Sequence, residues 1–225
     1  MSISNERPPD SFEAPLRAAH ALMRQRRGED ACRFLAQARD EALSSGLLDD
    51  AALFSSVRGS YLVAMGRDSE ALEAYLEAER LSKGDAYSRL RTARHLVSGM
   101  KQPGEALKKV STVLEAPPEG SAVRHEIHAI RGLAFLGLDQ PEQAIEELQV
   151  LCSEASPPQL PSVSWDLTLV EEFLHRHLAP QLCQRYLELV ESKAKKEGET
   201  RVLERALQLK STLPAARTPS PSQES

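Results

Sequence analysis

Apolar residues recur every three or four positions along most of the chain, which is the spacing of an amphipathic helix. In the stretch EALEAYLEAERL at 70–81, Ala, Tyr and Leu side chains share one side and glutamates fill the other. Breaks arrive about every 15–20 residues, and each break contains the helix-ending Gly or Pro. No window alternates long enough for a half-buried strand. The pattern predicts an all-α chain of about ten or eleven short helices.

Four alanines, separated by 40, 35 and 38 residues, repeat one register along this pattern. An apolar residue follows each alanine after four positions, and a small residue precedes most of them by twelve. Such a ladder indicates an internal repeat rather than chance. The ladder alanines are Ala31, Ala71, Ala106 and Ala144, and the residues twelve positions earlier are Ala19, Gly59, Arg94 and Gly132.

This register resembles the tetratricopeptide repeat, a helix-turn-helix unit of about 34 residues with a small residue in its first helix and A-x3-F in its second. Residues 52–85 match most clearly and 125–158 next, while 12–46, 90–118 and 161–196 match more loosely. The resemblance implies a right-handed α-solenoid of helix pairs, and 199–211 would form a capping helix at its end. We expect a single solenoid domain over 11–212, a flexible arm at 1–10 and a Pro/Ser-rich disordered tail at 213–225.

The small residues have a packing role in this interpretation. Gly59 and Gly132 would let the first helix of each pair approach the second helix of the same pair. The larger residues would fill the surrounding space, Leu62 with Tyr75 in one pair and Phe135 with Leu148 in another.

The resemblance also implies a binding surface, because the first helix of each tetratricopeptide pair lines the concave side where ligands lie. The positions include none of the Lys and Asn residues with which some chaperone-binding members hold a terminal carboxylate. The surface is instead apolar and rich in small residues, which suits an amphipathic helix or an apolar extended peptide. The expected groove residues are Leu53, Val57, Ser60, Ala64, Arg91, His95, Ile130 and Leu133.

Composition narrows the class of partner. The 225 residues include 32 Leu and 28 Ala, and 28 Lys and Arg against 33 Asp and Glu give a net charge of −5. This mild acidity argues against binding to nucleic-acid phosphates. Three separate cysteines among apolar neighbours predict small core residues in a reducing, cytoplasmic setting. No apolar run approaches the ~20 residues of a membrane span.

Candidate catalytic residues are few. His125 and His128 lie three apart with Glu126 between them, one residue short of the H-E-x-x-H zinc helix and without an evident third ligand. No nucleophile elbow, phosphate loop or dinucleotide motif occurs. We therefore expect no catalytic residue, no metal and no cofactor.

The leading functional hypothesis is a non-enzymatic scaffold that binds a protein or peptide partner in the concave groove. One alternative is a chaperone similar to the small three-repeat secretion chaperones that hold translocator proteins. A second alternative is a metal-dependent enzyme that uses His125 and His128. The sequence leaves the partner and the oligomeric state open.

Overall fold

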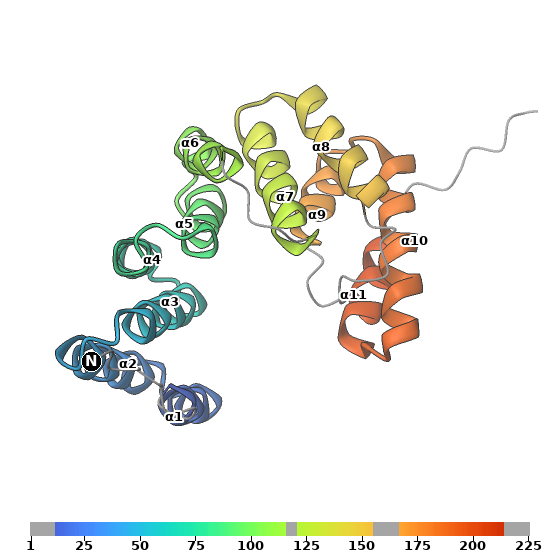
Figure 1. Cartoon of the computed structure of the whole chain (residues 1–225). Helices are drawn as coiled ribbons and strands as arrows, with labels where there is room; N and C mark the ends of the chain where they lie inside the picture. The colour runs from blue at the N-terminus through green and yellow to red at the C-terminus, as the bar shows by residue number, and fades with distance from the viewer. Residues whose placement is uncertain (1–11, 116–120, 155–166, 214–225) are drawn as a thin grey trace, which may run out of the picture. The chain divides into compact units, whose positions relative to one another are not determined.

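The computed structural model describes residues 12–115, 121–154 and 167–213, and these residues form eleven helices and no strand (Figure 1). The predicted all-α class is confirmed. No helix within these ranges is both long and apolar enough to cross a membrane. The helices are α1 (Glu13–Arg24), α2 (Gly28–Ser44), α3 (Leu48–Ala64), α4 (Asp68–Leu81), α5 (Ala86–Ser98), α6 (Pro103–Leu114), α7 (Ser121–Gly137), α8 (Pro141–Glu154), α9 (Thr168–His175), α10 (Pro180–Glu197) and α11 (Thr200–Lys210).

The chain divides into two compact units, Met1–Glu119 and Gly120–Ser225, called unit 1 and unit 2 below. In unit 1, each of α1 to α5 packs against the next helix in the chain. In unit 2, α7 packs against α8 and α10 against α11, while α9 contacts both α7 and α10. One continuous solenoid over 11–212 stays a prediction. The predicted arm at 1–10 and all of the predicted tail after Leu213 lie outside the described residues.

The turns inside the helix pairs confirm the alanine ladder. Five residues before each ladder alanine, the backbone is left-handed, and the alanine N–H donates to the carbonyl oxygen four residues back over 3.0–3.2 Å. One turn geometry therefore starts α2, α4, α6 and α8 in the same register. The left-handed residues are Arg26, Gly66, Lys101 and Asp139, with φ of 60°, 73°, 55° and 58°.

In the core of unit 1, small residues allow close helix packing, as the sequence predicts. The ladder alanine Ala71 is fully buried, and a Cβ added at Gly59 would lie 2.8 Å from the ring of Tyr75. Gly59 on α3 thus makes room for a ring from α4, the second helix of its own pair. Leu62 and Tyr75 belong to one buried cluster, as predicted.

Unit 2 uses the equivalent glycine differently. A Cβ added at Gly132 on α7 would lie 2.7 Å from Cδ2 of Leu169, which belongs to α9. The prediction that Gly132 makes room for the second helix of its own pair is therefore wrong, because α9, the helix that follows the pair, fills the space beside it. Large side chains complete this core, and the fully buried ones include Ile127, Ile130, Leu148, Leu151, Leu169, Phe173, Tyr186 and Leu187.

The last helix, α11, lies within one residue of the predicted capping helix at 199–211. Its Ala206 and Leu209 are buried, whereas Leu207 is 43% exposed. The buried apolar stripe of α11 is therefore narrow.

All three cysteines are buried free thiols, as predicted. Burial raises the pKa of Cys152 to about 11 and that of Cys183 to about 12, and it also raises the pKa of Cys32. Since the thiolate is the reactive form, these cysteines act as packing residues rather than nucleophiles.

Candidate partner-binding surface

Two helices of unit 1 present side chains to a shared open surface. They are α3 and α5, the first helices of successive pairs, and the residues on the side of this surface follow a spacing of three and four that places them on one face of each helix. On α3 this stripe holds Asp49, Leu53, Ser56, Ser60 and Val63, and on α5 it holds Ser88, Arg91, His95 and Ser98.

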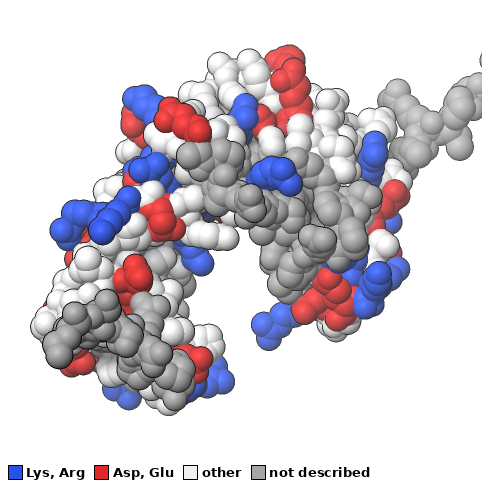
Figure 2. All heavy atoms as spheres, viewed as in Figure 1, with Lys and Arg blue, Asp and Glu red and all other residues white. Residues whose placement is uncertain are grey.

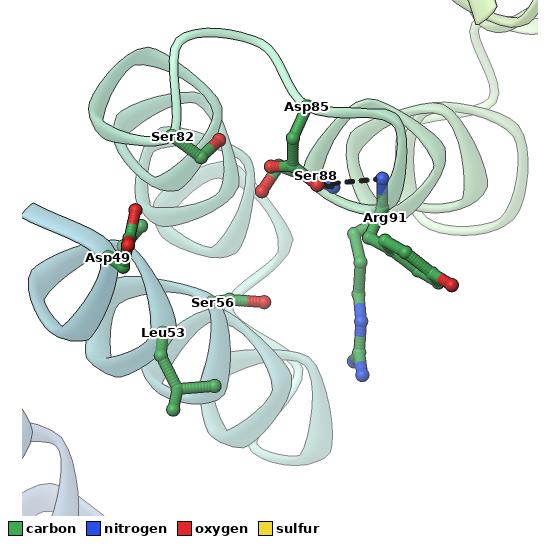
Figure 3. Close-up of a pocket in the computed structure, with 9 residues that line it drawn as sticks. Asp49, Leu53, Ser56, Ser82, Asp85, Ser88 and Arg91 are labelled. Atoms are coloured by element: carbon green, nitrogen blue, oxygen red, sulfur yellow. Dashed lines mark hydrogen bonds between the residues drawn. The ribbon is translucent and has the colours of Figure 1, made fainter. Parts of the chain in front are cut away.

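One end of this surface is a depression of about 390 Å³, which we call the acidic cavity (Figure 3). Ser56 points from α3 towards α5, and Ser82 follows the end of α4 (Figure 3). The exposed ring of Tyr87 adds an apolar surface. The lining residues are Asp49, Ala52, Leu53, Ser56, Ser82, Asp85, Tyr87, Ser88 and Arg91.

The second depression, the basic cavity, measures about 480 Å³ and shares Arg91 with the first. Three of its lining residues are cationic at neutral pH and one is an aspartate. Val63 on its rim is 40% exposed, so the cavity combines positive charge with an apolar edge. The lining residues are Val63, Asp68, Tyr75, Arg91, Arg94, His95, Ser98, Gly99 and Lys101.

Hydrogen bonds connect the floor of the surface across three helices. The hydroxyl groups of Ser60 and Tyr75 lie 3.1 Å apart, and Arg91 Nη1 donates to Ser60 Oγ over 3.3 Å. The Tyr75 and His95 rings have centroids 5.4 Å apart, and His95 Nε2 donates to the Asp68 carbonyl oxygen over 2.8 Å. Both rings are nearly buried, so they form a packed floor on which Arg91 is held at the junction of the two cavities.

Asp85 has a structural role in the acidic cavity. Its carboxylate accepts hydrogen bonds from the N–H groups of Tyr87 and Ser88 and caps the start of α5. Burial raises the pKa of Asp85, but these bonds and the hydroxyl groups of Ser82 and Ser88 outweigh that effect and hold the pKa below its usual value. This carboxylate is therefore already engaged by its own chain.

Some of the predicted groove residues meet here. Leu53, Arg91 and His95 line the cavities, and Ser60 contacts Arg91 between them. Val57 is half-buried against the unit 1 core, and Ala64 is exposed but lines neither cavity.

Ile130 and Leu133, expected in the same groove, are buried in unit 2 and offer no surface to a partner. The reason is that α7 packs against both α8 and α9. The candidate surface therefore leaves both residues out.

The sequence interpretation missed the residues that come from α4 and from the turns, such as Asp68, Tyr75 and Lys101. A signal for Lys101 exists: it occupies the same ladder position as Gly66, at the left-handed turn that precedes the second helix. The register alone could have placed that side chain beside α5.

The histidines of the metal-enzyme alternative have separate partners. His125 Nε2 lies 3.0 Å from the Tyr186 hydroxyl, whereas His128 Nδ1 donates to Glu147 Oε2 over 2.6 Å. Among the residues that the structure describes, no group of three or more His, Cys, Asp or Glu residues is arranged to hold a metal ion. These two histidines therefore do not form a shared site.

Charge is mixed rather than segregated on the visible face of the protein. Figure 2 shows Lys and Arg side chains interspersed with Asp and Glu side chains there, in agreement with the small net charge. Among the described residues that Figure 2 shows, Lys and Arg do not gather into a broad cationic surface of the kind that binds a nucleic-acid backbone.

Comparison with known proteins identifies the architecture. No protein-family model matches the sequence, and no curated protein sequence matches it either. A solved structure of MamA, the RS-1 ArsTM double mutant, matches with a TM-score of 0.52 at 17% identity, covering 91% of this chain and 94% of that one. MamA from Desulfovibrio magneticus RS-1, from residue 41 to its end, matches with a TM-score of 0.52 at 19% identity, covering 88% of this chain and 97% of that one. MamA is a tetratricopeptide-repeat protein, and the chain therefore has the tetratricopeptide-like helical fold that its alanine ladder predicts.

Proposed function

We propose that the protein is a non-enzymatic scaffold and that unit 1 binds a segment of a protein partner on the surface between α3 and α5. The observation that supports this proposal is the pair of adjoining cavities that share Arg91. Together they form a continuous surface along two helices, long enough for several residues of a peptide. Exposed Val63 and Tyr87 supply apolar contacts, and serines supply adaptable hydrogen bonds.

The fold adds general support, because stacked helix pairs form extended surfaces that repeat proteins use for binding. The alternatives receive less support. The metal-dependent enzyme loses its basis because His125 and His128 have separate partners. The secretion-type chaperone and the cytoplasmic setting stay predictions.

Selection from a library of random 12-residue peptides tests the proposal. The full chain is immobilised, enriched peptides are synthesised, and their dissociation constants are measured by fluorescence polarisation. The blocking variant is Ser56→Tyr, which adds a ring inside the acidic cavity. The matched control is Ser111→Tyr, an exposed position on α6 outside both cavities.

We expect Ser56→Tyr to weaken the selected peptides at least tenfold and Ser111→Tyr to change binding less than twofold. Circular dichroism confirms that both variants keep their helix content. If no peptide is enriched, or if both variants bind equally well, unit 1 does not bind peptides at this surface and the proposal is wrong.

A further inference from the structure

The two cavities differ in charge although they share one arginine. The basic cavity holds Arg91, Arg94 and Lys101 against the single carboxylate of Asp68. The acidic cavity holds two aspartates against Arg91 alone. Helix α5 contributes strongly to this difference, because its sequence AYSRLRTARHLVS contains three arginines and no acidic residue.

Two of these cations have no acidic partner among the described residues. Elsewhere in unit 1, Arg39, Arg67 and Lys109 each form an ion pair with a glutamate of another helix. Arg91 and Lys101, in contrast, form no ion pair with any residue that the structure describes. Arg91 makes one long hydrogen bond to Ser60, which leaves most of its guanidinium donors available to a ligand.

The aspartate of the basic cavity is turned towards the cavity floor. Its Oδ1 lies 3.9 Å from His95 Nε2, and a Cβ added at Gly99 would lie 2.9 Å from the same oxygen. Asp68 is thus packed against the end of α5. It balances only part of the positive charge that the three basic side chains bring to the cavity.

The fold brings both cations to the same cavity. Lys101 occupies the left-handed residue of the turn between α5 and α6, with φ of 55°. Arg91 lies at the middle of α5 and lines the cavity together with the packed Tyr75 and His95 rings. Cations without an acidic partner favour a carboxylate ligand, with which guanidinium groups make short, charge-assisted hydrogen bonds.

We infer that the partner segment places an internal Asp or Glu side chain in the basic cavity, with an apolar residue beside it against Val63. This inference rests on the proposed function and specifies its ligand: an acidic, partly apolar peptide rather than a neutral or basic one. Because the cavity is open to solvent, the acidic residue decides specificity and association rate more than total affinity.

The experiment uses 12-residue peptides displayed through their C-termini, so that no free terminal carboxylate is present. Selection on the full-length protein is expected to enrich Asp or Glu at a fixed spacing from an apolar residue. The same selection on Arg91→Glu/Lys101→Glu is expected to replace that acid by Lys or Arg. Lys196→Glu/Arg201→Glu, which changes the net charge equally at exposed positions of unit 2, is the control and should keep the acidic preference.

A second measurement uses the unmodified protein and does not depend on the folding of a variant. Replacing the enriched Glu by Gln in a synthetic peptide should raise the dissociation constant about tenfold at 50 mM salt, and less at 300 mM because salt screens exposed charges. A change below twofold overturns the inference, as does enrichment of peptides without a positioned acid.

These results separate the two proposals. If peptides are enriched without an acid and Ser56→Tyr still blocks them, the binding surface stands and only the acidic ligand is wrong. If no peptide is enriched, the proposed function fails and the inference fails with it.

Discussion

The glycines of α3 and α7 occupy equivalent ladder positions, yet they receive side chains from different directions. Gly59 accommodates Tyr75 from the second helix of its own pair, and the neighbouring face of α3 stays open to form the two cavities. Gly132 accommodates Leu169 from α9, and Ile130 and Leu133 become buried. A glycine thus permits another helix to approach closely, but the packing of the later helices determines which helix does so. The same packing determines whether the first helix of the pair keeps a surface exposed to a partner.

Two glutamates with cationic partners, one in each unit, differ in their exposure. In unit 2, the Glu147 side chain is only 7% exposed and contacts His128 and Arg131 over 2.6 and 2.9 Å. In unit 1, the comparable Glu77 is 23% exposed and accepts hydrogen bonds from Arg39 and Ser55 over 2.7 and 3.1 Å. Loss of the partners should therefore cost more at Glu147 than at Glu77, because a buried charge is destabilising once its partners are lost.

The largest expected difference between the units concerns thiol reactivity. At pH 8, iodoacetamide should label Cys32 in unit 1 first and Cys183 in unit 2 last, more than a hundredfold more slowly than a free thiol. The reason is that a pKa of about 11 for Cys152 and about 12 for Cys183 leaves very little thiolate. Peptide mapping by mass spectrometry gives the three rates.

The pH dependence of thiol labelling follows from the same raised pKa values. Since pH 8 and pH 9 both lie well below the raised pKa values of Cys152 and Cys183, that step should increase their labelling about tenfold. Guanidinium-unfolded protein, in which all three thiols should react alike, is the control. Equal rates for Cys32 and Cys183 in the folded protein would contradict the difference in burial.

The next prediction tests the two glycines directly. Gly59→Ala should lower the free energy of unfolding by about 1–3 kcal/mol, because the new methyl group meets the rigid Tyr75 ring. Gly132→Ala should cost less than about 1 kcal/mol, since it meets the end of a leucine side chain and alanine favours the helix. Urea unfolding measures both values.

A double variant identifies the cause of the Gly59 effect. Gly59→Ala/Tyr75→Leu should be less destabilised than the sum of its two single changes, because a leucine can move away from the added methyl group. Additive losses, or a larger loss at Gly132 than at Gly59, would show that the two glycines do not differ as the structure indicates.

The buried carboxylates give a smaller effect. Glu147→Gln should destabilise the protein by about 1.5 kcal/mol, because it leaves His128 and Arg131 with a weaker, neutral partner in a buried place. Glu77→Gln, at the more exposed site in unit 1, should cost about half as much. Denaturant unfolding in low and high salt gives both values, and the prediction is wrong if Glu77→Gln is the more harmful change.

Much of the fold could be predicted because, in repeat proteins, residues that contact each other within a repeat recur at fixed spacings along the sequence. The ladder alanines identified the second helix of four pairs, and the turn before each of them is left-handed as a shared register requires. The role of Gly132 was mispredicted because its contact with Leu169, 37 positions later, joins successive repeats, whereas the sequence interpretation expected a contact within one repeat.

The candidate surface was predictable only in part. Leu53, Arg91 and His95 follow from the first-helix positions of the resemblance, and they line the cavities. Helical spacing cannot give the exposure of Ile130 or Leu133, because burial depends on a later helix. Lys101 was missed because it lies in a turn, outside the first-helix positions that the resemblance supplies, although it shares its ladder position with Gly66.

The smallest expected effect concerns these turns. Gly66 suits its left-handed backbone, whereas Arg26 in unit 1 and Asp139 in unit 2 adopt the same conformation with a Cβ atom. Gly66→Ala should cost about 1 kcal/mol through backbone strain alone, since no atom lies within 4 Å of the added Cβ. Arg26→Gly and Asp139→Gly should each stabilise the protein by about 0.5 kcal/mol, the relief of strain being partly offset by the greater freedom of glycine in the unfolded chain. Equal gains in thermal unfolding would show that the turn is equivalent in the two units, and that the units differ in the helix that packs against the pair rather than in the pair itself. If Arg26→Gly raises the thermal stability and Asp139→Gly lowers it, the two units already differ in the turn within the helix pair.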